Sequence, residues 1–106
     1  MAWVLLLAAG LLEIVWAYSM KLSQGFTRGW PTAVTMLAML ASFALLSISM
    51  KTLPLGTAYT VWTGIGAVGA FVVGVVVLGE PLTIGRVVAV VLIVAGLSVM
   101  KLSTPV

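Results

Sequence analysis

The chain has 106 residues, of which 63% are hydrophobic and only 7% are charged, whereas an ordinary soluble domain carries about 25% charged residues. This composition excludes a soluble fold of this length and predicts a protein that resides in the lipid bilayer. The net charge of +3 comes from basic residues scattered among loops, which does not predict nucleic-acid binding, and the absence of cysteine and histidine leaves no disulfide, thiolate or ordinary transition-metal site.

Four apolar segments follow one another along the chain. A helix rises about 1.5 Å per residue, so a bilayer core about 30 Å thick needs about 20 apolar residues. The predicted helices cover about residues 2–20, 32–50, 57–78 and 85–101. The connections between them are short and rich in glycine and proline. The sequence therefore predicts an all-α fold, in which residues 1–106 form a single domain with four transmembrane helices.

The first segment contains a single charged residue, Glu13, well inside its apolar stretch. Ionisable side chains at that depth cost free energy to insert and usually bind something. All five basic residues fall at segment ends or in loops, so we expect Glu13 to bind an external partner, either a proton or a cationic substrate. Trp16 lies one turn further along the same face and is expected to donate its indole N–H to this acid. The alternative role for Trp16 is that of a membrane-interface anchor.

The second segment carries a thin polar stripe, because Thr35, Ser42 and Ser49 recur every seven residues. Hydroxyl groups in membrane helices often bond to carbonyls of their own helix, and we expect this of Thr35 and Ser49. Ser42 lies near the middle of its segment, at a depth comparable to that of Glu13. We therefore expect Ser42 to hydrogen-bond the carboxylate or an N–H group of a substrate.

The third segment combines aromatic residues with glycines. Tyr59 and Trp62 share one helical face, and aromatic faces attract cations, so these two residues are predicted to form a wall of the binding site. Gly64, Gly66 and Gly69 weaken the helix and permit close approach of a neighbour. Our hypothesis is that this glycine run bends differently in two states of a transporter. The alternative is a packing helix with a fixed kink.

The fourth segment is short because Arg86 and Lys101 bracket it, although the long stems of both residues can snorkel to the headgroups. It follows the turn Gly79-Glu80-Pro81. We expect Glu80 to lie in a solvated turn near the start of this helix and assign it no transport role.

The basic residues are divided almost equally between the two sides of the membrane. Lys51 and Lys101 lie on the side of the termini, and Lys21, Arg28 and Arg86 lie on the other. Because an excess of basic residues fixes orientation, a near tie predicts that the chain inserts both ways. Two opposite copies would then supply the inverted repeat that larger transporters carry within one chain. The alternative is that one orientation predominates.

Together these features resemble the small multidrug resistance family. The resemblance rests on Glu13 and Trp16 in EIVWA, on the run LPLGTAYTVWTGIGAVGA at residues 53–70, and on the GEPLT turn. Within the family, the WTGIGA run and Trp16 are similar to the guanidinium exporter subtype. The similarity extends over essentially the whole chain.

The resemblance implies an antiparallel, dual-topology homodimer in the bacterial inner membrane. This dimer would be a transporter and not an enzyme, would need no cofactor or metal, and would exchange protons for a guanidinium-type cation. The family's dimer contact lies on the fourth helix, where this chain has Ala89 and Gly96. The family's site residues that match here are Glu13, Trp16, Ser42, Tyr59 and Trp62.

The expected mechanism is competition for one carboxylate. Apolar surroundings disfavour the charged form of a carboxylate, which lets it hold a proton, and guanidinium presents paired N–H donors that match two carboxylate oxygens. Two alternatives remain open. One is a multidrug exporter of quaternary ammonium or lipophilic cations, and the other is a non-transporting, proteolipid-like membrane subunit.

Overall fold

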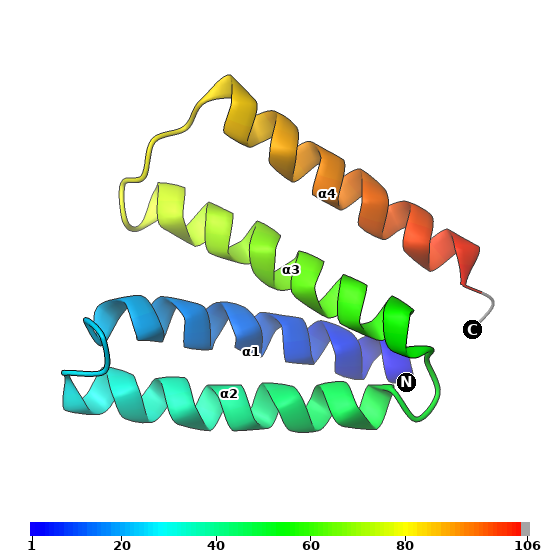
Figure 1. Cartoon of the computed structure of the whole chain (residues 1–106), viewed down its shortest axis with the longest axis horizontal. Helices are drawn as coiled ribbons and strands as arrows, with labels where there is room; N and C mark the ends of the chain where they lie inside the picture. The colour runs from blue at the N-terminus through cyan, green and yellow to red at the C-terminus, as the bar shows by residue number, and fades with distance from the viewer. Residues whose placement is uncertain (105–106) are drawn as a thin grey trace.

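A computed structural model describes residues 1–104, which form four long helices (Figure 1). Each helix has 20 to 22 residues and is apolar enough to cross a membrane. The prediction of an all-α fold with four membrane-spanning helices is therefore confirmed. The helices are α1 (Ala2–Leu22), α2 (Gly29–Ser49), α3 (Leu55–Val76) and α4 (Ile84–Ser103).

The helix ends differ from the expected positions by up to three residues. Helix α2 already begins at Gly29 and includes Pro31, because a proline in the first turn lacks only an N–H group that would have no intrahelical acceptor. Helix α4 begins directly after Thr83, whose hydroxyl accepts a hydrogen bond of 3.2 Å from the backbone N–H of Arg86. This N-cap gives α4 20 residues and a length of about 30 Å, with Arg86 and Lys101 inside the helix near its two ends.

The turn between α1 and α2 is organised around a buried serine. The Ser23 hydroxyl donates a hydrogen bond of 2.7 Å to the Met20 carbonyl and accepts one of 3.0 Å from the backbone N–H of Phe26. The chain between these residues has positive φ angles, at Gly25 among others, and glycine adopts this conformation without steric cost. The result is a tight antiparallel hairpin of α1 and α2.

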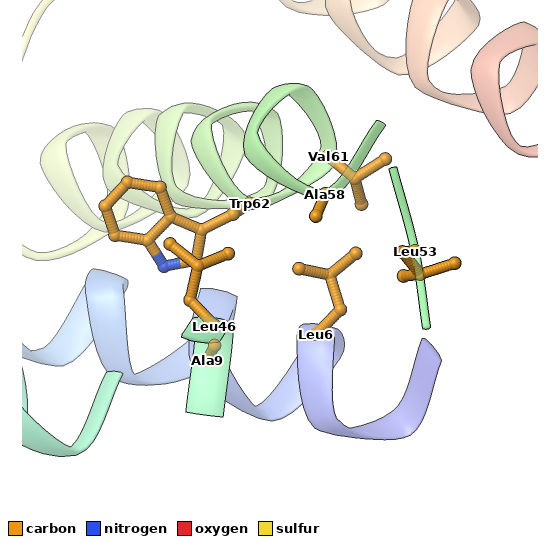
Figure 2. Close-up of a cluster of buried hydrophobic side chains, with 7 residues drawn as sticks. All are labelled: Leu6, Ala9, Leu46, Leu53, Ala58, Val61 and Trp62. Carbon is orange, nitrogen blue, oxygen red and sulfur yellow. The ribbon is translucent and has the colours of Figure 1, made fainter. Parts of the chain in front are cut away.

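Helix α1 lies between α2 and α3 and packs against both, whereas α4 packs along α3 (Figure 1). The buried core lies where the first three helices meet, and Figure 2 shows its side chains. In contrast, every residue of α4 is at least partly exposed. The core therefore joins α1, α2 and α3 and leaves α4 attached along one side. The core residues are Leu6, Ala9, Leu46, Leu53, Ala58, Val61 and Trp62.

The connection between α3 and α4 folds back onto the end of α3. A Cβ atom at Gly74 would meet the carboxylate of Glu80, so this glycine makes room for the acid. Glu80 also forms an ion pair of 3.3 Å with Arg86, which lies 5.2 Å from the ring centre of Phe71. The side chains of the ion pair are 35% and 41% exposed, so we attribute to the pair no more than about 1 kcal/mol of stability.

Candidate cation-binding site

The carboxylate of Glu13 projects from α1 toward α3 at a point where α3 has no side chain. A Cβ atom added at Gly66 would collide with the Glu13 carboxylate, so only glycine at this position lets the two helices approach with the acid between them. The Oε1 atom of Glu13 is buried and has no hydrogen-bond partner. Among residues 1–104 the only ion pair joins Arg86 to Glu80, so none of these residues supplies Glu13 with a counter-ion.

A second buried polar atom without a partner lies one turn further along α1. This atom is the indole Nε1 of Trp16, so the hydrogen bond predicted from Trp16 to Glu13 is not formed in this structure. Buried polar groups in folded proteins are normally hydrogen-bonded, and each exception calls for an explanation. One acceptor and one donor without partners among the described residues thus lie one turn apart on the same helix.

Of the two partners predicted for Ser42, the Glu13 carboxylate is not the one that its hydroxyl binds. Its hydroxyl is fully buried, donates a hydrogen bond of 2.7 Å to the Ala9 carbonyl and accepts one of 3.0 Å from the Trp62 indole. Ser42 therefore does not touch the Glu13 carboxylate through a hydrogen bond. It links all three core helices and fixes the orientation of Trp62, which Figure 2 shows within the core.

The other two hydroxyls of the polar stripe behave as predicted. Thr35 donates to the Pro31 carbonyl and Ser49 donates to the Leu46 carbonyl, each at 2.7 Å and each within α2. The prediction that these residues bond to their own helix is confirmed. Of these three hydroxyls, Ser42 is the one that hydrogen-bonds to other helices.

Replacement of Ser42 by alanine should destabilise the folded chain. The buried N–H of Trp62 would lose its acceptor, which costs about 1–3 kcal/mol. The matched control is Ser49→Ala, because the Leu46 carbonyl keeps a backbone bond from Met50 and nothing is left unsatisfied. Thermal unfolding in detergent measures both variants, and equal losses of stability would show that the Ser42–Trp62 bond does not stabilise the fold.

Four aromatic rings form a continuous row across the three core helices. The ring centres of Trp16 and Phe43 are 6.4 Å apart, those of Phe43 and Trp62 are 5.8 Å apart, and those of Trp62 and Tyr59 are 5.7 Å apart. The first two pairs meet edge to face, a preferred arrangement of aromatic rings. The row thus begins at Trp16, one turn from Glu13 on α1, and ends at Tyr59 on α3, whose side chain is half-exposed.

Sequence analysis missed Phe43, the central member of this row. A signal was present, because Phe43 is the one aromatic residue in the interior of α2 and lies at the same depth as Ser42. Its contacts with Trp16 and Trp62 depend on how α2 packs against its neighbours, which the spacing within α2 does not reveal.

The remaining predicted residues divide between two interfaces. Gly69 lies against Ile14 of α1, as Gly66 lies against Glu13, and Gly64 lies against Leu97 of α4. In contrast, Ala89 and Gly96 lie on the exposed surface of α4. A Cβ atom at Gly96 would meet no atom within 4 Å. The acid and the aromatic row therefore lie on α1, α2 and α3, and Gly96 of α4 faces the end of this row, since it lines the same groove as Tyr59.

This arrangement suits a small cation. An acid without a counter-ion attracts positive charge, and aromatic rings nearby attract cations through their faces. Within residues 1–104 no group of three or more acidic, histidine or cysteine side chains is placed to hold a metal ion. The chemistry available is thus reversible binding of a proton or a cation to one carboxylate.

Comparison with known proteins agrees with this geometry. The chain is 55% identical over 104 residues to a protein of Citrobacter freundii named guanidinium exporter, with 98% of this chain and 99% of that protein covered. It is 51% identical over 104 residues to a guanidinium exporter of Yersinia pseudotuberculosis, covering 98% of this chain and all of that protein. The family model described as Small Multidrug Resistance protein matches residues 1–93. The chain therefore belongs to the small multidrug resistance family of multi-pass membrane transporters.

Proposed function

We propose that this protein exports guanidinium and small substituted guanidinium ions across the bacterial inner membrane in exchange for protons. The observation that carries the proposal is the buried Oε1 of Glu13, which has neither a hydrogen bond nor a counter-ion among the described residues. The names of the relatives, which share more than half of their residues with this chain, supply the substrate class.

Coupling follows from competition for the same oxygens. Guanidinium is planar and donates paired N–H groups, so it binds a carboxylate through two parallel hydrogen bonds. A proton on Glu13 removes the negative charge that this binding needs. The carboxylate therefore holds either ligand but not both, and an inward flow of protons drives the cation outward.

The aromatic residues have supporting roles in this proposal. The indole N–H of Trp16, which has no partner, can donate to a Glu13 oxygen that the substrate leaves free. The hydrogen bond to Ser42 holds the Trp62 ring in a fixed orientation beside the cation. Tyr59 is 54% exposed, so its ring can admit or retain a cation. Ser42 thus acts on the site by positioning Trp62.

We also propose that two copies pair in opposite orientations. The support is that α4 has no buried residue and that basic residues are nearly balanced across the membrane. Four helices are few for enclosing a substrate path, and a second copy would close it. The exposed Gly96 and Ala89 on α4 are small enough to allow close packing against a partner helix.

Electrical recording on the purified, reconstituted protein tests this function. We expect currents with guanidinium and methylguanidinium that respond to a pH gradient, from a preparation that light scattering identifies as a dimer. Tetramethylammonium is the matched control, because it carries the same charge but has no N–H to donate to Glu13. Equal currents with both ions would favour a multidrug exporter, and no current from the purified protein would favour a non-transporting subunit.

A further inference from the structure

Helix α4 leaves two separate grooves beside the rest of the molecule. Leu97 packs where a Cβ atom at Gly64 would collide with it, and Leu97 lines both grooves. One groove, of about 590 Å³, lies between α4, α3 and the first turns of α1, and we call it the terminal groove. The other, of about 540 Å³, lies between α3 and α4 alone and includes Gly64, Ala67 and Gly96; we call it the glycine groove.

The terminal groove is apolar along its length and positive at one end. Its walls include Val4 and Leu7 from α1 together with Ile65 from α3. Lys101, in the last turn of α4, lines its end and lies 5.0 Å from the ring centre of Trp3. No carboxylate among residues 1–104 pairs with Lys101, since the one ion pair is Arg86 with Glu80. The groove therefore combines apolar walls with a cation that no described carboxylate pairs with.

The two grooves suit different occupants. Helices pack closely in a membrane where glycine, alanine and other small residues line the contact, and the glycine groove has this character. The terminal groove is lined by no glycine or alanine, and bulky aliphatic side chains form its walls. A flexible chain fits such a surface better than a second helix does.

The residues at the end of the terminal groove place that end at the membrane interface. Trp3 lies in the first turn of α1 and Lys101 in the last turn of α4, so both belong to the interface between hydrocarbon and headgroups. A lysine there extends its ammonium toward the headgroups while its stem stays in apolar surroundings. Anionic phospholipids are attracted to basic residues at this level.

We propose that the terminal groove binds an anionic phospholipid. One acyl chain lies against Val4, Leu7 and Ile65, and the phosphate binds the ammonium of Lys101. Charge complementarity with Lys101, which forms no ion pair within residues 1–104, selects an anionic lipid over a zwitterionic one. This site is separate from Glu13, and its occupancy does not depend on which ion the protein transports.

Native mass spectrometry of the purified full-length protein tests the lipid site by counting retained phosphatidylglycerol and phosphatidylcholine. We expect the unmodified protein to prefer phosphatidylglycerol and Lys101→Gln to lower its affinity about fivefold, the effect of one basic residue near a membrane surface. Lys51→Gln is the matched control, because Lys51 lies on the same side of the membrane but outside the groove. This control should change the affinity less than twofold.

A second variant tests the apolar part of the site. Val4→Trp fills the groove while leaving Lys101 in place, and it should also reduce retention of phosphatidylglycerol. Equal retention of the two lipids by the unmodified protein, or equal affinities for Lys101→Gln and Lys51→Gln, would overturn the proposal. So would cross-linking between copies of a Ser98→Cys variant, since Ser98 lines the terminal groove and the chain has no other cysteine.

Discussion

Glu13→Gln should abolish proton-coupled guanidinium transport. Glutamine nearly preserves the shape of the side chain but can neither bind an exchangeable proton nor carry the negative charge that pairs with the cation. Hydrogen bonds to a charged group contribute about 1.5–3 kcal/mol each, so losing a pair of them should weaken guanidinium binding by about a hundredfold or more. Calorimetric titration measures the binding, and guanidinium-driven pH change in proteoliposomes measures the coupling.

Glu80→Gln provides the matched control. It makes the same chemical change at the only other acid in the chain, which lies in the connection between α3 and α4 and pairs with Arg86 at a half-exposed site. We expect transport within about twofold of the unmodified protein, because exposed ion pairs contribute about 1 kcal/mol at most. Normal proton-coupled flux in the Glu13 variant would refute the proposed mechanism. Equal losses in both variants would show that the effect is not specific to the membrane site.

Gly66→Ala is expected to impair both stability and transport. The added methyl group would need the space that the Glu13 carboxylate occupies, so either α1 and α3 move apart or the acid turns away. Overpacking of this kind costs about 1–3 kcal/mol, and displacement of the acid should reduce guanidinium flux by about tenfold or more. Thermal unfolding in detergent and flux in proteoliposomes measure the two effects.

The same substitution at Gly56 separates steric conflict from helix propensity. Gly56 also belongs to α3, but a Cβ atom there would meet no atom within 4 Å. Gly56→Ala should therefore keep full transport and gain up to about 1 kcal/mol from the better helix propensity of alanine. If the two variants behaved alike, the close contact between Gly66 and Glu13 would have no functional importance.

The sequence sufficed to predict the number of membrane helices and the family, and both are confirmed. Long apolar segments form helices in lipid, because each helix satisfies its own backbone hydrogen bonds. The isolation of Glu13 was equally visible, since the basic residues lie outside the apolar segments. These conclusions depend on position along the chain and not on how the helices pack.

The partners of individual side chains could not be predicted in the same way. Spacing gives the depth of Ser42 but not the direction in which α2 faces, and its hydroxyl bonds Ala9 and Trp62 instead of Glu13. Adjacent helical residues point about 100° apart, so the place of Phe43 in the aromatic row depends on the rotation of α2, which sets its ring between Trp16 and Trp62. Likewise, nothing in the spacing of Gly74 indicated that Glu80 would fold over it.

The loose attachment of α4 separates two tasks that many transporters combine in the same helices. The acid and the aromatic row lie on α1, α2 and α3, whereas α4 packs along α3 and buries no residue. In the proposed dimer, changes on the outer surface of α4 would therefore alter which sister chain is recruited, or which lipid is bound, without disturbing the proposed ion exchange. A duplicated copy of this chain could diverge toward an obligate heteromeric pair through this one helix.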